Sequence, residues 1–390
     1  MTRHALTVAG SAVLLAAAVP VAAQSVTSRE FGHLADGRAV HEYQLDSGTG
    51  MRVRLLDYGG IIRAIEVPDR AGHLANVVLG FDSLANIEKR PYFSSLIGRY
   101  ANRLSDGGVT IDGVFHKLAT NDKGVISHGG TGGFGAQLWQ ATPISMPGRA
   151  AVRLHLVSAA GENGFPGTLT TDVTFSVSRD RTLRLDYRAT TDAPTVVNFT
   201  HHAYFNLEGA GSGSADRQWI RILADRYTVL DPNRLPTGEI RPVAGTPFDL
   251  SHWTQIGERV RSSDPQMVAA HGFDHNFVLR GGSGPLPLAA CASDPLSGRA
   301  MLVRTDQPGV QLYTANSLDG SLKGESGRML RQGDGFALET QHFADSPRHP
   351  NFPSTVLRPG EVFATSTSFS FVAAKPQLSP GGPPDVPGCR

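Results

Sequence analysis

The chain has 390 residues and a formal net charge of +1 at pH 7, with 36 basic and 35 acidic residues interspersed along it. This balance argues against nucleic-acid binding, which requires a strongly basic surface. The 44 glycines and 25 prolines are typical of a protein with many turns. The two cysteines, Cys291 and Cys389, form neither a disulfide framework nor a paired metal-binding motif. They could pair in an oxidising compartment, but Cys389 lies in a tail that we expect to be loose.

Residues 1–23 have the features of a secretory signal peptide. A short, weakly basic start precedes an apolar run over 5–19, and small residues then offer a cleavage site after Ala23. The apolar run is short and rich in alanine, which argues against a membrane span. We therefore expect an exported protein, periplasmic or secreted, without stable membrane insertion once the signal is removed. The alternative is an uncleaved anchor.

After a short lead-in, segments in which apolar and polar residues alternate are separated by turn residues. The alternation is clear over 152–156, 173–177 and 183–187, and it is the pattern of strands with one buried face. Asp112-Gly113 lies between two short β-forming segments, which is a strong hairpin signal because glycine accepts a positive φ. The sequence thus predicts a protein composed mainly of short strands.

Helical periodicity is confined to residues 262–271, and no internal repeat of fixed period is present. The end of the chain, 376–390, is rich in proline and glycine, a composition that predicts a disordered tail. Residues 24–375 are therefore expected to form a single all-β domain, most plausibly a large β-sandwich.

The segment Val196–Leu207 is rich in β-branched and aromatic residues and predicts a buried strand. It contains two adjacent histidines, His201 and His202. Because neighbouring residues of a strand point to opposite faces, only one of these imidazoles can face a given pocket. Imidazole is well suited to proton transfer near neutral pH. The alternative is a buried histidine that is hydrogen-bonded to the backbone.

Several polar residues stand in apolar or glycine-rich surroundings between or within the predicted strands. These candidate site residues are Asn102, Arg103, His128, Asp274, Gln311 and Glu339. A glutamate in an apolar strand is costly unless it is paired or used. Burial would raise the pKa of the Glu339 carboxyl toward a value that suits a general base.

Polar planar side chains together with aromatic ones suit a sugar, which has hydroxyl groups on its edge and C–H groups on its faces. A carboxylate base and an imidazole acid suit the opening of a cyclic hemiacetal, which requires neither a metal nor a cofactor. The histidines at 128, 201, 202 and 275 have no spacing that predicts a shared metal ion. We therefore expect no metal site.

Six short motifs, in this order, make the sequence from about Phe31 to Ala373 resemble the aldose 1-epimerases, also called galactose mutarotases. The motifs lie at 102–103, 128–130, 202–207, 272–277, 307–311 and 338–341. The resemblance implies a large antiparallel β-sandwich and the interconversion of the α and β anomers of free hexoses such as glucose and galactose. It also implies that small-molecule aldoses are the binding partners.

The resemblance further implies that Glu339 is the general base on the C1 hydroxyl and that His202 is the acid that protonates the ring oxygen. The positions that match substrate contacts of the family are Asn102, Arg103, His128, Tyr204, Asp274 and Gln311. One departure is His201, which stands where relatives can carry asparagine. Strand alternation directs its side chain away from that of His202, so we expect it to be structural.

Two alternatives remain at this point. One is a sandwich that binds sugars without catalysis. The other is a different sugar-active enzyme on the same scaffold. An epimerase of hexose 6-phosphates would need additional arginine or lysine residues at the pocket, and a glycosidase would need two suitably spaced carboxylates, for which Asp274 and Glu339 are the candidates.

Overall fold

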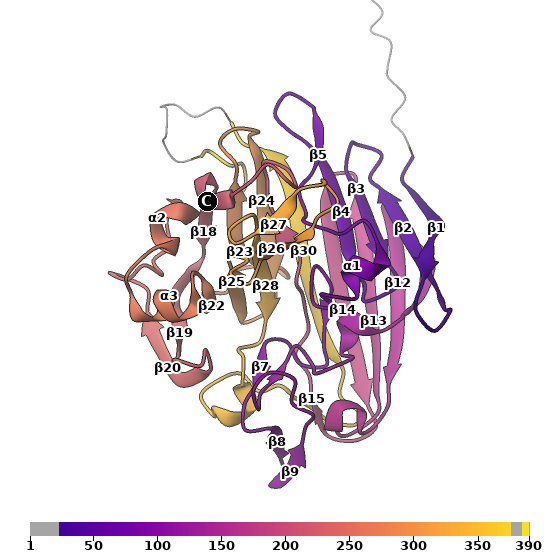
Figure 1. The fold of residues 1–390 in the computed structure, drawn as a ribbon, viewed down its shortest axis with the longest axis vertical. Helices are drawn as coiled ribbons and strands as arrows, with labels where there is room; N and C mark the ends of the chain where they lie inside the picture. Colours follow the sequence, from indigo (N-terminus) through magenta and orange to yellow (C-terminus); the bar gives the residue numbers. More distant parts are fainter. Residues whose placement is uncertain (1–22, 376–383, 390) are drawn as a thin grey trace, which may run out of the picture.

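The computed structural model describes residues 23–375 and 384–389, and Figure 1 shows how they fold. The predicted signal peptide lies outside the described residues apart from Ala23, so its cleavage stays a prediction. Within the described residues, no helix is long and apolar enough to cross a membrane. These residues form antiparallel sheets, as the sequence predicted, together with three short α-helices.

The largest sheet has nine strands and forms the back layer of the molecule. Its strand order shows that β30, near the end of the chain, joins an early half to a late half. In order across the sheet, the strands are β11 (Gln140–Met146), β12 (Arg149–Ser158), β13 (Leu169–Ser178), β14 (Thr182–Thr191), β30 (Phe363–Ala373), β24 (Arg299–Thr305), β23 (Leu288–Ser293), β18 (Trp219–Ile222) and β21 (Thr254–Gln255).

Two smaller sheets cover this layer, as Figure 1 shows. The five-stranded sheet lies over β12–β14 and consists of β1 (Ser25–His33), β2 (Ala39–Asp46), β3 (Arg52–Leu56), β4 (Ile62–Pro68) and β5 (Leu74–Asn76). The six-stranded sheet lies over the late half and consists, in order, of β17 (Tyr204–Phe205), β28 (Phe336–Gln341), β25 (Gly309–Tyr313), β22 (Asp274–Leu279), β19 (Ala224–Leu230) and β20 (Pro236–Pro242).

Short elements connect the sheets. The two-stranded pairs are β6 (Leu96–Ile97) with β16 (Thr200–His201), β7 (Arg103–Leu104) with β10 (Ile126–Ser127), β8 (Gly108–Ile111) with β9 (Val114–Lys117), β15 (Thr195–Val196) with β29 (Val356–Leu357), and β26 (Asp319–Lys323) with β27 (Met329–Arg331). The α-helices are α1 (Leu84–Ile87), α2 (Ile256–Val260) and α3 (Pro265–Ala270). Single 3₁₀ turns lie at Phe134–Ala136, Glu162–Gly164, Ala215–Arg217 and Ser346–Arg348.

The core lies between the layers because alternate residues of each strand face inward. Val173, Phe175 and Val177 of β13 are fully buried, as the alternation in the sequence predicted. They belong to one apolar cluster that draws residues from all three large sheets. The hydroxyls of Thr340 on β28 and Thr367 on β30 also share a hydrogen bond of 2.5 Å across the layers. This packing holds the six-stranded sheet, which carries most of the site, against the nine-stranded sheet.

The segment Val196–Leu207 differs from the single buried strand that its composition predicted. It is buried, but it is divided into β15, β16 and β17, which pair with β29, β6 and β28 respectively. Asn198 lies at one of the breaks, where its backbone N–H donates to the Arg99 carbonyl and its side chain bonds to the His342 backbone. The segment therefore passes from one sheet to the next, which local composition does not reveal.

Other local predictions are confirmed. Asp112 and Gly113 connect β8 and β9 and have φ values of 51° and 79°, the left-handed pair that a tight hairpin requires. The helical segment is confirmed but is shorter than expected. Helix α3 begins at Pro265, after the N-cap Asp264, and ends at Ala270, before the left-handed C-cap residue His271.

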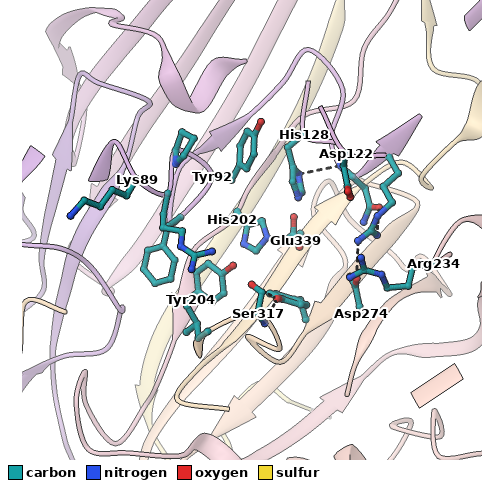
Figure 2. A pocket seen from close by; sticks show the side chains of 17 residues that line it. Lys89, Tyr92, Asp122, His128, His202, Tyr204, Arg234, Asp274, Ser317 and Glu339 are labelled. Atoms are coloured by element: carbon teal, nitrogen blue, oxygen red, sulfur yellow. Dashed lines mark hydrogen bonds and ion pairs between the residues drawn. The ribbon is translucent and has the colours of Figure 1, made fainter. Parts of the chain in front are cut away.

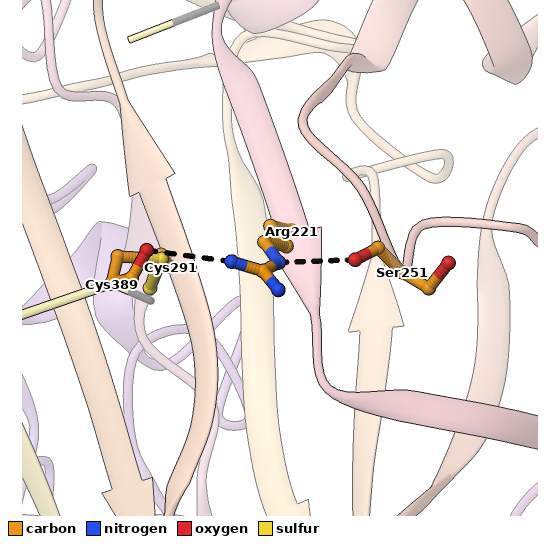
Figure 3. The surroundings of a disulfide bond; sticks show 4 residues. All are labelled: Arg221, Ser251, Cys291 and Cys389. Atoms are coloured by element: carbon orange, nitrogen blue, oxygen red, sulfur yellow. Dashed lines mark hydrogen bonds between the residues drawn. A yellow bond between two sulfur atoms is a disulfide. The ribbon is translucent and has the colours of Figure 1, made fainter. Parts of the chain in front are cut away.

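The tail is partly packed, which the sequence did not predict. Residues 384–389 lie against the outer side of the nine-stranded sheet, where Cys389 forms a disulfide with Cys291 of β23, and Val386 is buried beside it. Figure 3 shows Arg221 of β18 beside this disulfide, with its guanidinium donating to the backbone carbonyls of Cys389 and Ser251. The expected disorder is therefore wrong for these six residues, because a covalent link offsets the weak packing that composition alone suggests.

Candidate active site

A pocket of about 370 Å³ opens at the six-stranded sheet, and Figure 2 shows the side chains that line it. Strands β17, β22, β25 and β28 contribute Tyr204, Asp274, Tyr313 and Glu339 to its floor. Loops that leave the small sheets contribute its walls. The lining residues are Lys89, Arg90, Pro91, Tyr92, Phe93, Asn102, Arg103, Asp122, His128, His202, Tyr204, Arg234, Asp274, Tyr313, Ser317, Leu318 and Glu339.

Glu339 lies in the middle of β28, opposite Gln311 of β25, and is 2% exposed. Its Oε1 is 3.5 Å from Nε2 of His202, and its Oε2 has no hydrogen-bond partner among the described residues. Burial raises the pKa of the carboxyl well above its ordinary value, and the charge of Asp274 raises it further against the opposing effect of Arg103. Because Oε2 is buried without a partner in the described part of the chain, ionising this carboxyl is costly, in agreement with its raised pKa.

His202 follows β16 directly, and its ring is held between aromatic side chains. It stacks on Tyr204 with ring centroids 4.8 Å apart and meets Tyr313 edge-on at 5.8 Å. Phe93 stacks on the other side of Tyr204 at 4.3 Å, which completes an apolar wall. Burial lowers the pKa of His202 to about 4, although its own backbone and the charge of Asp274 act in the opposite direction.

The pKa of His202 is lowered and that of Glu339 is raised, so the buried pair favours the arrangement in which each group is neutral. A neutral imidazole with a protonated carboxyl holds one proton, as does an imidazolium with a carboxylate. The arrangement with an imidazolium and a carboxylate therefore needs no proton from outside the pocket. It forms when one proton moves between two groups 3.5 Å apart. Hydroxyl groups of a ligand would favour the charged arrangement, because they can donate to the carboxylate and accept from the imidazolium.

A chain of polar contacts crosses the other side of the pocket. The Arg103 guanidinium donates to Asn102 Oδ1 at 3.2 Å and to Asp274 Oδ2 at 3.2 Å, and Gln311 Nε2 donates to Asp274 Oδ1 at 2.8 Å. Burial alone would raise the pKa of Asp274, but Arg103 and Gln311 outweigh it, so that the pKa lies below its ordinary value. Asp274 is therefore a fixed carboxylate whose remaining lone pairs can accept hydrogen bonds from hydroxyl groups.

His128 is held in place by an unusual loop. Its Nδ1 accepts a hydrogen bond from the Asn102 backbone N–H at 3.4 Å, so the proton of the neutral ring lies on Nε2. Its ring meets that of His202 edge-on at 5.3 Å, and burial lowers its pKa well below the ordinary value. The following Gly129 has φ +84°, and a Cβ there would lie 1.9 Å from the Gly98 carbonyl oxygen, so only glycine fits.

His201 points away from the pocket, as strand alternation predicted. Its Nε2 lies 3.1 Å from the backbone oxygen of Gly60, and its ring meets Phe175 in the core edge-on. Burial lowers its pKa to about 3, so it is neutral near pH 7.

The structure brings seven of the eight sequence-predicted site residues to the pocket, and the exception is Gln311. Gln311 is buried behind Asp274 and reaches the pocket only through it. The sequence did not predict the other lining residues, which are Lys89, Arg90, Pro91, Tyr92, Phe93, Asp122, Arg234, Tyr313, Ser317 and Leu318. Among these, Tyr313 lies two residues after the motif at 307–311, and Asp122 lies in the polar loop that precedes His128. Within the described residues, no group of three histidine, cysteine or acidic side chains could hold a metal ion.

Residues 41–370 match the family model of aldose 1-epimerase. Human galactose mutarotase is 41% identical over 352 residues, which cover 90% of this chain and 99% of the human protein. The aldose 1-epimerase of Escherichia coli (strain K12) is 32% identical over 341 residues, covering 87% of this chain and 97% of that protein. The chain belongs to the aldose 1-epimerase family.

Solved structures agree with this assignment. The galactose 1-epimerase of Lactobacillus acidophilus superimposes with a TM-score of 0.79 at 26% identity, covering 90% of this chain and 99% of that one. An aldose epimerase homologue from C. elegans superimposes with a TM-score of 0.76 at 27% identity, covering 83% of this chain and 96% of that one. The β-sandwich predicted from the sequence is thus the fold of these relatives.

Proposed function

We propose that the protein is an aldose 1-epimerase that interconverts the α and β anomers of free hexoses, with glucose and galactose as substrates. The observation that carries this proposal is the buried pair of Glu339 and His202, whose Oε1 and Nε2 atoms lie 3.5 Å apart at the bottom of the pocket. Relatives named galactose mutarotase and aldose 1-epimerase support it.

In the proposed reaction, the Glu339 carboxylate takes the proton of the anomeric hydroxyl while the His202 imidazolium donates a proton to the ring oxygen. The C1–O5 bond breaks, and C1 becomes the carbonyl carbon of the open-chain aldehyde. Rotation about C1–C2 presents the other face of the carbonyl. Reclosure, with both proton transfers reversed, gives the other anomer and restores the starting charges.

The remaining side chains would hold the sugar during this rotation. Asn102, Arg103 and Asp274 offer donors and acceptors to the ring hydroxyls, and the Nε2–H of His128 offers a further donor. The Tyr204 and Tyr313 rings provide apolar surface for the C–H groups of the sugar. Gln311 is assigned a positioning role, since it fixes the Asp274 carboxylate.

A glycosidase is disfavoured by the partner that the structure gives to Glu339. Such an enzyme needs one carboxyl group that stays protonated and a second that ionises across the bond. Asp274 could be only the ionised partner, since Arg103 and Gln311 hold it in that form. The nearest partner of Glu339 is an imidazole, which supplies the acid of a mutarotase instead.

Export to the periplasm or the exterior is part of the proposal. The apolar start of the sequence supports it, and so does the Cys291–Cys389 disulfide, because disulfides persist mainly in oxidising compartments.

Polarimetry of freshly dissolved α-glucose and α-galactose tests the function. The wild-type protein should accelerate the approach to anomeric equilibrium, and Glu339→Gln should not. Glu361→Gln is a matched control because Glu361 is exposed and lies outside the pocket. If the wild type accelerates neither sugar, the proposal fails.

A further inference from the structure

The mouth of the pocket carries more positive charge than a neutral sugar requires. Lys89, Arg90 and Arg234 line it in addition to Arg103, whose charge is already paired with Asp274. Among the described residues, Lys89 and Arg234 have no side-chain hydrogen bond and no ion pair within 4.0 Å. Arg90 has only a long ion pair of 3.7 Å with Asp319, whose side chain is 60% exposed. Such an exposed pair is weak and can exchange its acid for another anion.

These cations lie at two ends of the pocket. Figure 2 shows Lys89 on the side of His202 that is remote from Asp274, and Arg234 beside Asp274. Arg90 adjoins Lys89 in the chain and lines the same pocket. The order along the pocket in Figure 2 is Lys89, then His202, then Glu339, then Asp274, so Arg90 belongs to the end that holds Lys89.

The direction of a bound pyranose follows from this order and the proposed chemistry. With the anomeric oxygen at Glu339 and the ring oxygen at His202, the next ring atom beyond His202 is C5, which carries C6. The C2 and C3 hydroxyls then lie on the side of Asp274. The substituent on C6 is thus directed toward Lys89 and Arg90.

We propose that this pocket accepts aldoses with an anionic group on C6, hexuronates in particular, and that Arg90 recognises that group with the support of Lys89. This inference rests on the proposed function, since it uses the orientation that ring opening requires. A guanidinium can bind a carboxylate with two parallel hydrogen bonds, which a primary alcohol cannot match. A phosphate on C6 has the same charge chemistry. The proposed export favours the carboxylate over the phosphate, and a comparison with glucose 6-phosphate tests this choice.

The experiment compares galactose with galacturonate, which differ only at C6. Exchange between the anomeric proton signals in NMR measures kcat/KM for both sugars at equilibrium, without the need for pure anomers. The wild type should turn over both. Arg90→Gln should lower the galacturonate-to-galactose ratio of kcat/KM about tenfold. Arg90→Lys should restore only part of that loss, because an ammonium group keeps the charge but cannot form the two parallel hydrogen bonds.

Two controls separate a specific contact from a general charge effect. Arg153→Gln removes a half-exposed arginine of β12 outside the pocket and should leave the ratio unchanged. A rise from about 0.05 M to about 0.5 M salt should lower kcat/KM for galacturonate while that for galactose stays constant, because screening acts on the charged substrate alone.

The outcomes distinguish the inference from the function on which it rests. No exchange with either sugar overturns the proposed function. Exchange with galactose alone, or a ratio that Arg90→Gln does not change, overturns the inference and leaves the function intact. A parallel comparison of glucose with glucose 6-phosphate identifies the anion: an Arg90-dependent preference for the phosphate, without one for galacturonate, would contradict the choice of hexuronates.

Discussion

Nε2 of His202 lies 3.5 Å from Oε1 of Glu339, and burial displaces the pKa values of the two groups in opposite directions. The imidazole becomes a stronger acid and the carboxyl a stronger base than either would be in water. These are the changes that a proton-donating imidazolium and a proton-accepting carboxylate require. The apolar wall formed by Phe93, Tyr204 and Tyr313 is therefore part of the catalytic design as well as a surface for the sugar.

The pH dependence of kcat/KM should reflect this pair. The active enzyme holds one proton between the two groups, and a second proton binds only near the lowered pKa of His202, about 4. Activity should therefore persist below pH 6 and fall as the pH approaches 4. The alkaline limb should lie well above the ordinary carboxyl range, because the pKa of Glu339 is raised. Polarimetric rates in buffers from pH 3.5 to 9 check this, and an acid limb centred near 6.5 would contradict it.

Glu339→Gln should abolish measurable mutarotation, with a loss of at least about 10²–10⁴-fold, because the amide cannot accept the proton. The substitution should not lower the stability of the folded state, since glutamine has the same shape as glutamate and a group that is costly to bury as an anion is removed. Thermal unfolding near pH 7 should therefore give a Tm equal to or above that of the wild type. A large fall in Tm would attribute the loss of activity to unfolding instead.

Global stability should fall in mild acid. The folded-state pKa values of His202, His201 and His275 are about 4, 3 and 4, below the ordinary value of 6.5. The unfolded chain therefore binds more protons than the folded one as the pH falls below 6.5. The stabilisation is complete above pH 6.5 and is lost as the pH falls through the folded-state values. Urea unfolding at pH 7.5, 6 and 5 should show a decreasing free energy of unfolding, and His201→Asn should weaken that dependence.

Gln311→Leu should impair catalysis although residue 311 does not line the pocket and makes no contact with the sugar. The substitution removes the 2.8 Å hydrogen bond to Asp274 Oδ1 and leaves the carboxylate held by Arg103 alone. A hydrogen bond to a charged group contributes about 1.5–3 kcal/mol, so kcat/KM should fall roughly 10- to 100-fold. Asp274→Asn should lower kcat/KM more than Gln311→Leu does. The double variant should have a kcat/KM only slightly below that of Asp274→Asn. Additive losses would show that Gln311 acts independently of Asp274.

The sequence predicted the antiparallel strands because alternation such as that at 173–177 is a local property of any half-buried strand. It predicted Glu339 and His202 because their surroundings are unusual for their residue types. It could not predict the division of Val196–Leu207, where each pair of residues finds a partner distant in the chain. It also missed Arg90, since an arginine at a pocket and one on an open surface have the same local sequence signal.

The Cys291–Cys389 disulfide should stabilise the fold without affecting catalysis. It closes a loop of 98 residues and fastens the tail to the outer side of the nine-stranded sheet, away from the pocket. Replacing both cysteines by serine should lower the free energy of unfolding by about 2–4 kcal/mol. The mutarotation rate at 25 °C should stay the same. Urea unfolding with and without dithiothreitol gives the comparison: the reductant should destabilise the wild type and leave the double variant unchanged, and an equal response of both proteins would show that the bond does not form.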